Sequence, residues 1–325
     1  MDQSNNRQSA LGRLLRPVAF SMLAAVVGVG FWQWGQTRSE EDFLRKIRDN
    51  GGTYKRGQRI PDWLRSIVLK LSRVDLRRMD PIVAATLGRR LEGTNLDLAP
   101  LARMSSLRSL IVEADLTTAE WRLVGSLTNL EELEVRNSNG CFLAEDFEQI
   151  SRLQNLRTLV LKPAHLDTDG FIHLTKIPRL EVLRIPRVFA YRDQPLPKHP
   201  QTGSNPKTKR VRPSADALRN IARLRSLQRL DFAECREIGD EEMLVLTSLL
   251  PDGSHPLPNL NELILQHTSI TFAGVATIGN LRNLRHLNVA ETGMNRSLMM
   301  QLLQRQGLKP DIVRTGNNSI IELKR

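Results

Sequence analysis

Cysteine is almost absent from this sequence of 325 residues, which contains only Cys141 and Cys235. The two lie far apart, and nothing in their spacing suggests a disulfide framework. Aromatic residues are also scarce, at 5% of the chain, whereas 40% of the residues are hydrophobic. Stability must therefore come from packing, and the imbalance favours a core built from repeated aliphatic positions.

Motifs for catalysis and metal binding are missing as well. The sequence contains no HExxH or CxxC cluster, no P-loop, no dinucleotide-binding glycine motif and no GxSxG nucleophile elbow. Asp167-x-Asp169-Gly170 looks like the start of a calcium loop, but no glutamate follows at the twelfth position. We therefore predict a protein that is not an enzyme and has no cofactor and no metal site.

Acidic residues are fewer than basic ones, 35 against 47, which gives a formal net charge of +12. A basic chain can bind nucleic acid or anionic lipid. Here the arginines alternate with acids, as in Glu132, Glu134 and Arg136, and no aromatic residues interleave with them for stacking on bases. We predict that nucleic acid is not the partner, and an arginine-rich codon bias alone would explain the excess.

One uncharged segment, residues 17–36, follows a short basic stretch with Arg7, Arg13 and Arg16. A helix of about 20 residues spans about 30 Å, the hydrocarbon thickness of a bilayer. The positive-inside rule then predicts a cytoplasmic N-terminus and a repeat domain in the periplasm or outside the cell. We predict a single-pass transmembrane anchor. A cleaved signal peptide, which would give a secreted protein, and a buried core helix are the alternatives.

The pattern Leu-x-x-Leu-x-Φ, where Φ is an aliphatic residue or Phe, recurs through the chain. The alternation at its last three positions predicts a short strand with one buried face. Helical stretches follow, with Thr271, Asp240, and Asp167 or Thr168 as candidate N-caps. The first leucines are separated by 23, 26, 24, 47, 33 and 24 residues, and they are Leu107, Leu130, Leu156, Leu180, Leu227, Leu260 and Leu284.

These residues resemble the leucine-rich-repeat family, whose pattern L-x-x-L-x-L-x-x-N/C-x-L covers about residues 65–325. Ile270–Val275 and Leu166–Phe171 look like the I-T-D-A-G-L link of bacterial repeats, and the chain is similar to bacterial repeat proteins with a single anchor. The resemblance implies an α/β solenoid, an arc or horseshoe with a concave parallel sheet and helices on the convex side. It also implies that Cys235 is structural and bonds the turn between repeats.

The two longest intervals between repeats contain insertions. The first is a loop at residues 186–213, rich in Pro, Lys and Arg, which cannot bury enough surface to fold alone. It is either a solvated loop or a basic arm for an anionic partner. The second, Pro251–Pro256, offers no recognisable chemistry. The expected parts are a basic tail (1–16), the transmembrane helix (17–36), a short helix and linker (37–60), an irregular N-terminal cap with degenerate repeats (61–106), and the repeat domain (107–325) with a final short strand in a C-terminal cap (307–325).

Outward-facing strand positions are the candidate binding surface. They combine an apolar line with charges, which suits a protein interface. We predict an unknown protein partner on the concave face. The alternative is an anionic polymer or membrane surface bound by Arg and Lys residues and the 186–213 loop, and the sequence leaves the oligomeric state unknown. The candidate residues are Ile111, Glu132, Glu134, Arg136, Val160, Lys162, Arg184, Arg229, Asp231, Glu262, Ile264 and His286.

Overall fold

The computed structural model describes residues 40–57, 82–88, 98–113, 116–136, 142, 144–162, 164–165, 170–186, 188–189, 213–315 and 318–324. Several predicted features lie outside these residues: the tail at 1–16, the anchor at 17–36, much of the cap at 61–106, Cys141 and most of the 186–213 loop. Among the helices that are described, none is both long and apolar enough to cross a membrane.

The chain divides into two compact units. One unit comprises Met1–Asp49 and Gln58–Asp80, and its described part is a helix at residues 40–49. The other comprises Asn50–Gly57 and Pro81–Arg325, and we call it the repeat unit.

The strands of the repeat unit form one long sheet. The seven strands predicted from the leucine pattern are confirmed as β3 to β5, β7 and β9 to β11, which pair in parallel along with β2. Two short strands, β6 (Ala164–His165) and β8 (Val188–Phe189), form a separate parallel pair. In order along the main sheet the strands are β1 (Thr53–Arg56), β2 (Ile82–Leu87), β3 (Ser109–Val112), β4 (Glu132–Val135), β5 (Thr158–Leu161), β7 (Val182–Arg184), β9 (Arg229–Asp231), β10 (Glu262–Ile264), β11 (His286–Asn288), β13 (Asn318–Lys324) and β12 (Lys309–Thr315).

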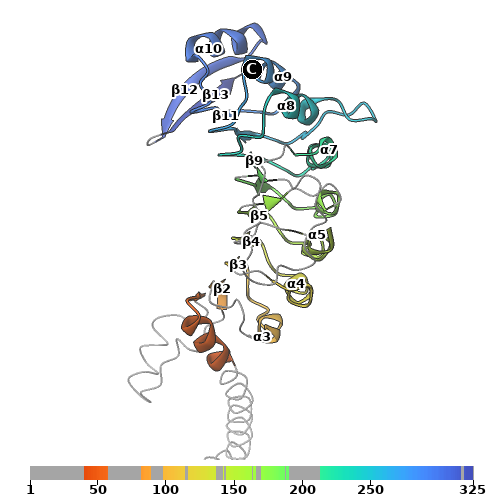
Figure 1. The fold of residues 1–325 in the computed structure, drawn as a ribbon, viewed down its shortest axis with the longest axis vertical. Coiled ribbons are helices and arrows are strands. Elements are labelled where there is room, and N and C mark those ends of the chain that lie inside the picture. The colour runs from red at the N-terminus through yellow and green to blue at the C-terminus, as the bar shows by residue number, and fades with distance from the viewer. Residues whose placement is uncertain are drawn as a thin grey trace, which may run out of the picture. The chain divides into compact units, whose positions relative to one another are not determined.

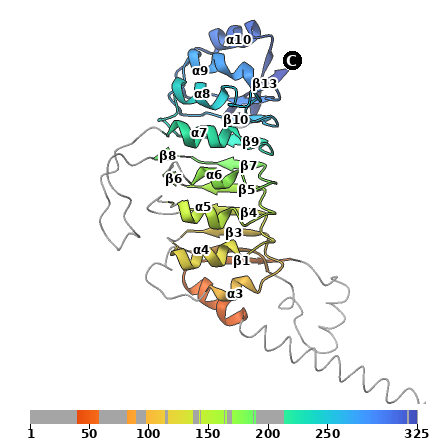
Figure 2. The same cartoon turned by 90° about the vertical axis from the view of Figure 1, so that its right-hand side faces the viewer.

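Helices follow the strands and lie on the opposite side of the stack (Figures 1 and 2). The two leucines of every pattern are at most 2% exposed between the two layers, which is the leucine-rich-repeat arrangement. In Figure 1 the repeats curve toward the strand side, so the sheet is concave. The helices are α3 (Ala99–Ala102), α4 (Thr118–Gly125), α5 (Ala144–Ile150), α6 (Phe171–Leu174), α7 (Ala215–Ala222), α8 (Asp240–Thr247), α9 (Phe272–Thr277), the 3-10 helix η3 (Ile278–Asn280) and α10 (Arg296–Arg305).

Several of the few aromatic residues gather beneath the helices. Ring centroids are 6.1 Å apart for Trp121 and Phe142, 5.7 Å for Phe142 and Phe147, and 5.0 Å for Phe147 and Phe171. Gly170 lies against this row, because a Cβ atom there would be 2.3 Å from Cδ2 of Phe147. The glycine of the predicted repeat link is therefore required by close packing, since any larger residue would displace a buried ring.

Asparagines join successive repeats on the side where each helix leads into the next strand. Each stands directly before the first leucine of its repeat and donates from Nδ2 to a backbone carbonyl of the repeat before it. The bonds run from Asn129 to Ser105 (3.0 Å), from Asn155 to Thr128 (2.9 Å), from Asn259 to Arg225 (2.7 Å) and from Asn283 to Pro258 (2.6 Å).

The cysteine and cap predictions have different outcomes. Cys235 is buried and its Sγ donates to the carbonyl of Ile185 in the preceding repeat, at 3.0 Å, which confirms a structural role. Thr271 is confirmed as the N-cap of α9. Asp240 as the cap of its own helix is wrong, because Gly239 is the N-cap of α8. Likewise Gly170 is the N-cap of α6, and the candidates Asp167 and Thr168 lie outside the described residues.

Asp240 instead caps the helix of the next repeat. Its Oδ1 accepts hydrogen bonds from the amides of Thr271, at 2.8 Å, and Gly274, at 2.9 Å, and its Oδ2 accepts from the Thr271 hydroxyl at 2.5 Å. A carboxylate at a helix N-terminus meets free N–H groups and the positive end of the helix dipole. One side chain thereby joins α8 to α9.

Antiparallel strands lie at both edges of the sheet. The predicted short strand is confirmed as β12, but it is not the last strand of the chain, because β13 follows it. The chain turns back into β13, which pairs antiparallel with both β12 and β11. The sequence signal for β13 is the alternation of Ile321 and Leu323, both buried, with Glu322. At the other edge β1 pairs antiparallel with β2.

Asp240→Ala should lower the melting temperature near neutral pH, and its difference from wild type should shrink in acid. Burial alone would raise the pKa of Asp240, but the hydrogen bonds from Thr271 and Gly274 outweigh it and lower the pKa in the folded chain. A carboxyl with a lowered folded pKa stabilises the fold above its unfolded pKa, about 3.9, and this contribution is lost as pH falls through the folded value.

Thermal unfolding followed by circular dichroism, from about pH 7 to about pH 3, measures this difference. Asp216→Ala is the matched control, because Asp216 is also in the first turn of a helix, and its bond to Arg219 stays within that helix. If both variants lose the same melting temperature with the same pH dependence, the bonds from Asp240 to the next repeat stabilise the fold no more than a bond within one helix.

Candidate protein-binding face

Outward-pointing residues line up across the concave sheet, because its neighbouring parallel strands are in register. The outer row contains Ser109, Glu132, Thr158, Val182, Arg229, Glu262 and His286. The middle row contains Ile111, Glu134, Val160, Arg184, Asp231, Ile264 and Asn288. Glu113, Arg136 and Lys162 follow directly after β3, β4 and β5. We call these residues together the concave face, and all twelve candidates belong to it.

The middle row is less accessible than the sequence predicted. Val160 is 5% exposed, Asp231 2% and Ile264 8%, so placing these three on an exposed surface was wrong. Each lies between two neighbours of the same row, about 4.8 Å away on either side, and these shield it. Ile111 and Val182 are half-buried, so the apolar line reaches the surface only in part.

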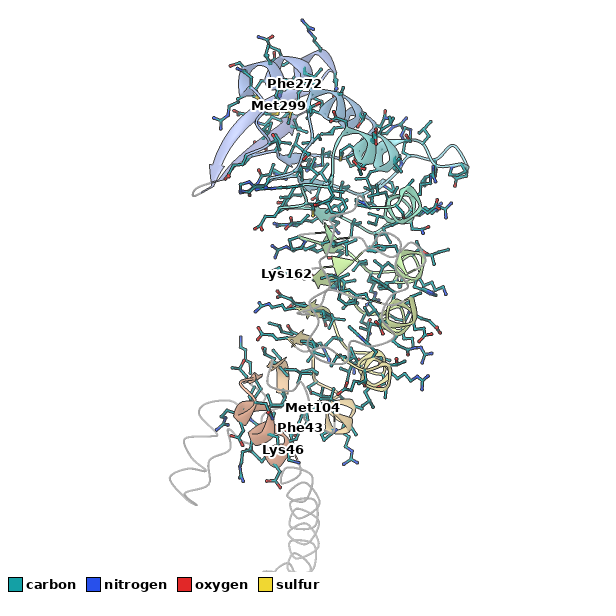
Figure 3. The ribbon with its side chains drawn as sticks, in the orientation of Figure 1. Phe43, Lys46, Met104, Lys162, Phe272 and Met299 are labelled. Carbon is teal, nitrogen blue, oxygen red and sulfur yellow. The ribbon has the colours of Figure 1, made fainter. Side chains whose placement is uncertain are left out.

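A cluster of four charged residues joins the ends of β3, β4 and β5. The guanidinium of Arg136 donates to Glu113 and to Glu134, at 2.8 Å each, and the ammonium of Lys162 lies 3.2 Å from Glu134. Burial alone would raise the pKa of Glu134, but hydrogen bonds from Arg136 and Lys162, with their positive charges, outweigh burial and lower it. Figure 3 shows Lys162 on the strand side of the stack.

Further along the face, ion pairs again link neighbouring strands. Nε of Arg184 donates to Oδ2 of Asp231 at 2.8 Å, and Oδ1 of Asp231 accepts from the amide of Ala233 at 2.9 Å. The Asp231 side chain is only 3% exposed, so Arg184 covers it and neutralises its charge. In the outer row Arg229 lies 3.1 Å from Glu262.

Two of the polar candidate residues, Glu132 and His286, are not bound to another side chain in the described part of the chain. Glu132 is exposed and His286 is half-buried, and neither has an ion pair or side-chain hydrogen bond within the described part of the chain. They lie near opposite ends of the outer row, on β4 and β11. A partner could contact both without breaking an existing bond.

His267 lies at the left-handed turn after β10, where φ is +57°. Its Nε2 is 2.7 Å from the carboxylate of Glu291 in the next repeat. Across the described ranges, no group of three or more His, Cys, Asp or Glu side chains is arranged to hold a metal ion.

The candidate set chosen from the sequence omits Glu113 and Asn288. Glu113 completes the four-residue charge cluster, and Oδ1 of Asn288 accepts from the amide of Ala290 at 3.0 Å, as Asp231 does from Ala233. Both residues follow the same alternation as the chosen ones, and this alternation already identifies them as outward-facing positions.

No family model matches the chain, and no curated protein matches it. Solved structures that resemble it include an internalin of Listeria monocytogenes, with 16% identity and a TM-score of 0.39 over 64% of this chain and 55% of that one. The Toll–Spätzle complex of Drosophila has 14% identity and a TM-score of 0.38 over 61% of this chain and 22% of that one.

A leucine-rich-repeat protein of Leptospira interrogans has 15% identity and a TM-score of 0.34 over 62% of this chain and 49% of that one. This chain therefore spans less than two thirds of the length of each of the three structures. Identities and TM-scores this low give no information about what the chain binds. The repeat architecture is established by the chain's own leucine pattern and strand register.

Arg184→Ala should destabilise the fold more than Arg229→Ala. Both arginine side chains are 39% exposed, but the carboxylate left behind is 3% exposed for Asp231 and 22% for Glu262. Losing a bond to a buried charge costs about 1–2 kcal/mol, whereas losing an accessible surface pair costs less than about 1 kcal/mol. Urea unfolding of the two variants measures both values, and equal losses would contradict the importance of carboxylate burial.

Proposed function

We propose that this chain binds a protein partner on its concave face. The observation that carries the proposal is the pre-formed charge network, in which Arg136 is held by Glu113 and Glu134, and Arg184 by Asp231. Side chains already fixed in the free protein lose little entropy on binding. Solenoids of this kind present an extended concave surface that is used for binding.

The chemistry of the face favours protein over nucleic acid. Acids accompany the bases throughout, so no continuous positive track is available for a phosphate backbone. Half-buried apolar residues, Ile111 and Val182, lie beside the charged side chains. A mixed surface with apolar and charged parts is what a protein interface requires.

We also propose that residues 17–36 hold the protein in a membrane as an uncleaved anchor, with the N-terminus in the cytoplasm and the repeats outside it. The support is the uncharged stretch, the basic residues before it, and Trp32 and Trp34 at its far end. Such a protein would present the concave face to partners beyond the membrane.

Photo-crosslinking on the intact chain in its own membrane tests the binding face. A photoreactive amino acid in place of Glu132 should give crosslinks to a protein, because this position lies on the concave face and is exposed. The matched control is the same amino acid in place of Arg122, which is exposed on α4 in the adjacent helical layer. A negative charge introduced at His286 (His286→Glu) should reduce the crosslink from position 132. Equal crosslinking from both positions would contradict the assignment.

Paired substitution in the uncharged stretch tests the anchor. Val26→Arg with Val27→Arg should release the chain from membranes washed at high pH, because each arginine at a helix centre costs about 3 kcal/mol on insertion. Val26→Leu with Val27→Leu should stay in the membrane. Intact mass reports cleavage directly, and a mature chain lacking its first segment would establish the signal-peptide alternative instead.

A further inference from the structure

A cleft of about 480 Å³ opens on the edge of the repeat unit where helices lead into strands. It lies away from the outer and middle rows, since none of their residues lines it. It is lined by Ala222, Arg223, Arg225, Leu250, Ser254, His255, Pro258, Arg282 and Asn283.

The hollow arises because one repeat lacks the cations of its neighbours. Arg223 and Arg225 stand four and two residues before Leu227, and Arg282 stands two residues before Leu284. In the repeat between them, prolines occupy the same places, at 256 and 258. Short neutral residues thus lie between arginines contributed by the repeats on either side.

The Pro251–Pro256 insertion forms a wall of the cleft and is held by local bonds. Asp252 accepts from the amide and the hydroxyl of Ser254, at 2.9 and 2.6 Å, and the Leu250 amide donates to the Ser254 carbonyl at 2.9 Å. Gly253, at φ +75°, makes the turn. The sequence suggested no chemistry for this insertion, but folding brings His255 and Ser254 beside the arginines.

Leu257, next to this wall, has strained backbone. Its φ is +45°, a left-handed conformation that costs a residue with a side chain about 1–2 kcal/mol. It is held there by burial, at 1% exposure, and by a hydrogen bond from its amide to the Ala222 carbonyl at 2.9 Å. Strain of this kind gathers at binding sites, where surrounding packing maintains it.

The three arginines are exposed. Within the described residues none of them has an ion pair, and Arg223 has only a 3.4 Å hydrogen bond to Asn220. By contrast Arg152, which stands four residues before its leucine as Arg223 does, lies 3.6 Å from Glu148. Nδ1 of His255 is buried without a hydrogen-bond partner among the same described residues.

We propose that this cleft binds a phosphate monoester group carried on a small apolar body. Three arginines line the cleft, and set against the carboxylate of Asp252, which interacts with Arg225, they leave two positive charges in excess, which matches a dianion. Arginine is the side chain best suited to bidentate contacts with phosphate. Ala222, Leu250 and Pro258 supply the apolar surface for the body of the ligand. The cleft would act as a second binding site, independent of the concave face.

Calorimetric titration of the full chain with phenyl phosphate tests the proposal, and inorganic phosphate, benzoate and phenol are the comparison ligands. Phenyl phosphate should bind most tightly, inorganic phosphate several-fold more weakly because it lacks the apolar body, and benzoate about tenfold more weakly because it carries a single charge. Arg225→Gln and Arg282→Gln should each weaken phenyl phosphate about tenfold.

Arg152→Gln is the matched control and should bind phenyl phosphate as wild type does. Unchanged thermal unfolding of the Arg225 and Arg282 variants separates lost binding from lost folding. Absence of phenyl phosphate binding to wild type, benzoate binding as tight as phenyl phosphate, or an equal loss in Arg152→Gln would each overturn the proposal. These outcomes leave the concave face untouched, because its crosslinking test uses other residues.

Discussion

Each repeat buries its apolar side only against its neighbours, and the rest of the structure depends on this constraint. A strand of three or four residues with one helix has no core of its own, whereas stacking brings the leucines of each pattern to at most 2% exposure. Because the strands must pair in register for the leucines to align, every other strand position is placed in register as well. The outer and middle rows of the concave face are thus a by-product of core packing.

Hydrogen bonds between neighbouring repeats supplement that packing at three places: one edge of the stack, the strand ends and the helical layer. On one edge Asn155 and its equivalents bond the carbonyl of the preceding repeat, at the strand ends Cys235 bonds Ile185, and in the helical layer Asp240 bonds the start of α9. Each satisfies polar groups that the tight turns would otherwise leave unpaired. The concave face extends the same principle, since its ion pairs also join neighbouring strands.

The sequence predicted the solenoid well, because leucine spacing and strand alternation are local signals. It predicted the strands β3 to β5, β7 and β9 to β11, the role of Cys235 and the cap at Thr271. The sequence-based prediction failed where the role or the exposure of a residue depends on which residue of a neighbouring repeat lies beside it. Asp240 was assigned to its own helix, and Val160 and Ile264 were expected at the surface, because shielding by Glu134, Arg184 and Asp231 follows only from the register. The cleft beside Pro258 was missed for the same reason, since its arginines come from repeats that are separated in the sequence.

The antiparallel strands β1 and β12–β13 at the two edges of the sheet limit how the protein can change length in evolution. At one edge an added repeat would meet β1, which runs against the repeat strands, and at the other edge β13 separates the repeat strands from β12. A new repeat strand therefore continues the parallel register only when it is inserted between β2 and β11. Each internal duplication would lengthen the concave face by one strand spacing, about 4.8 Å, and leave both ends intact. The length of the binding face can thus change in discrete steps without exposing a new unpaired strand edge.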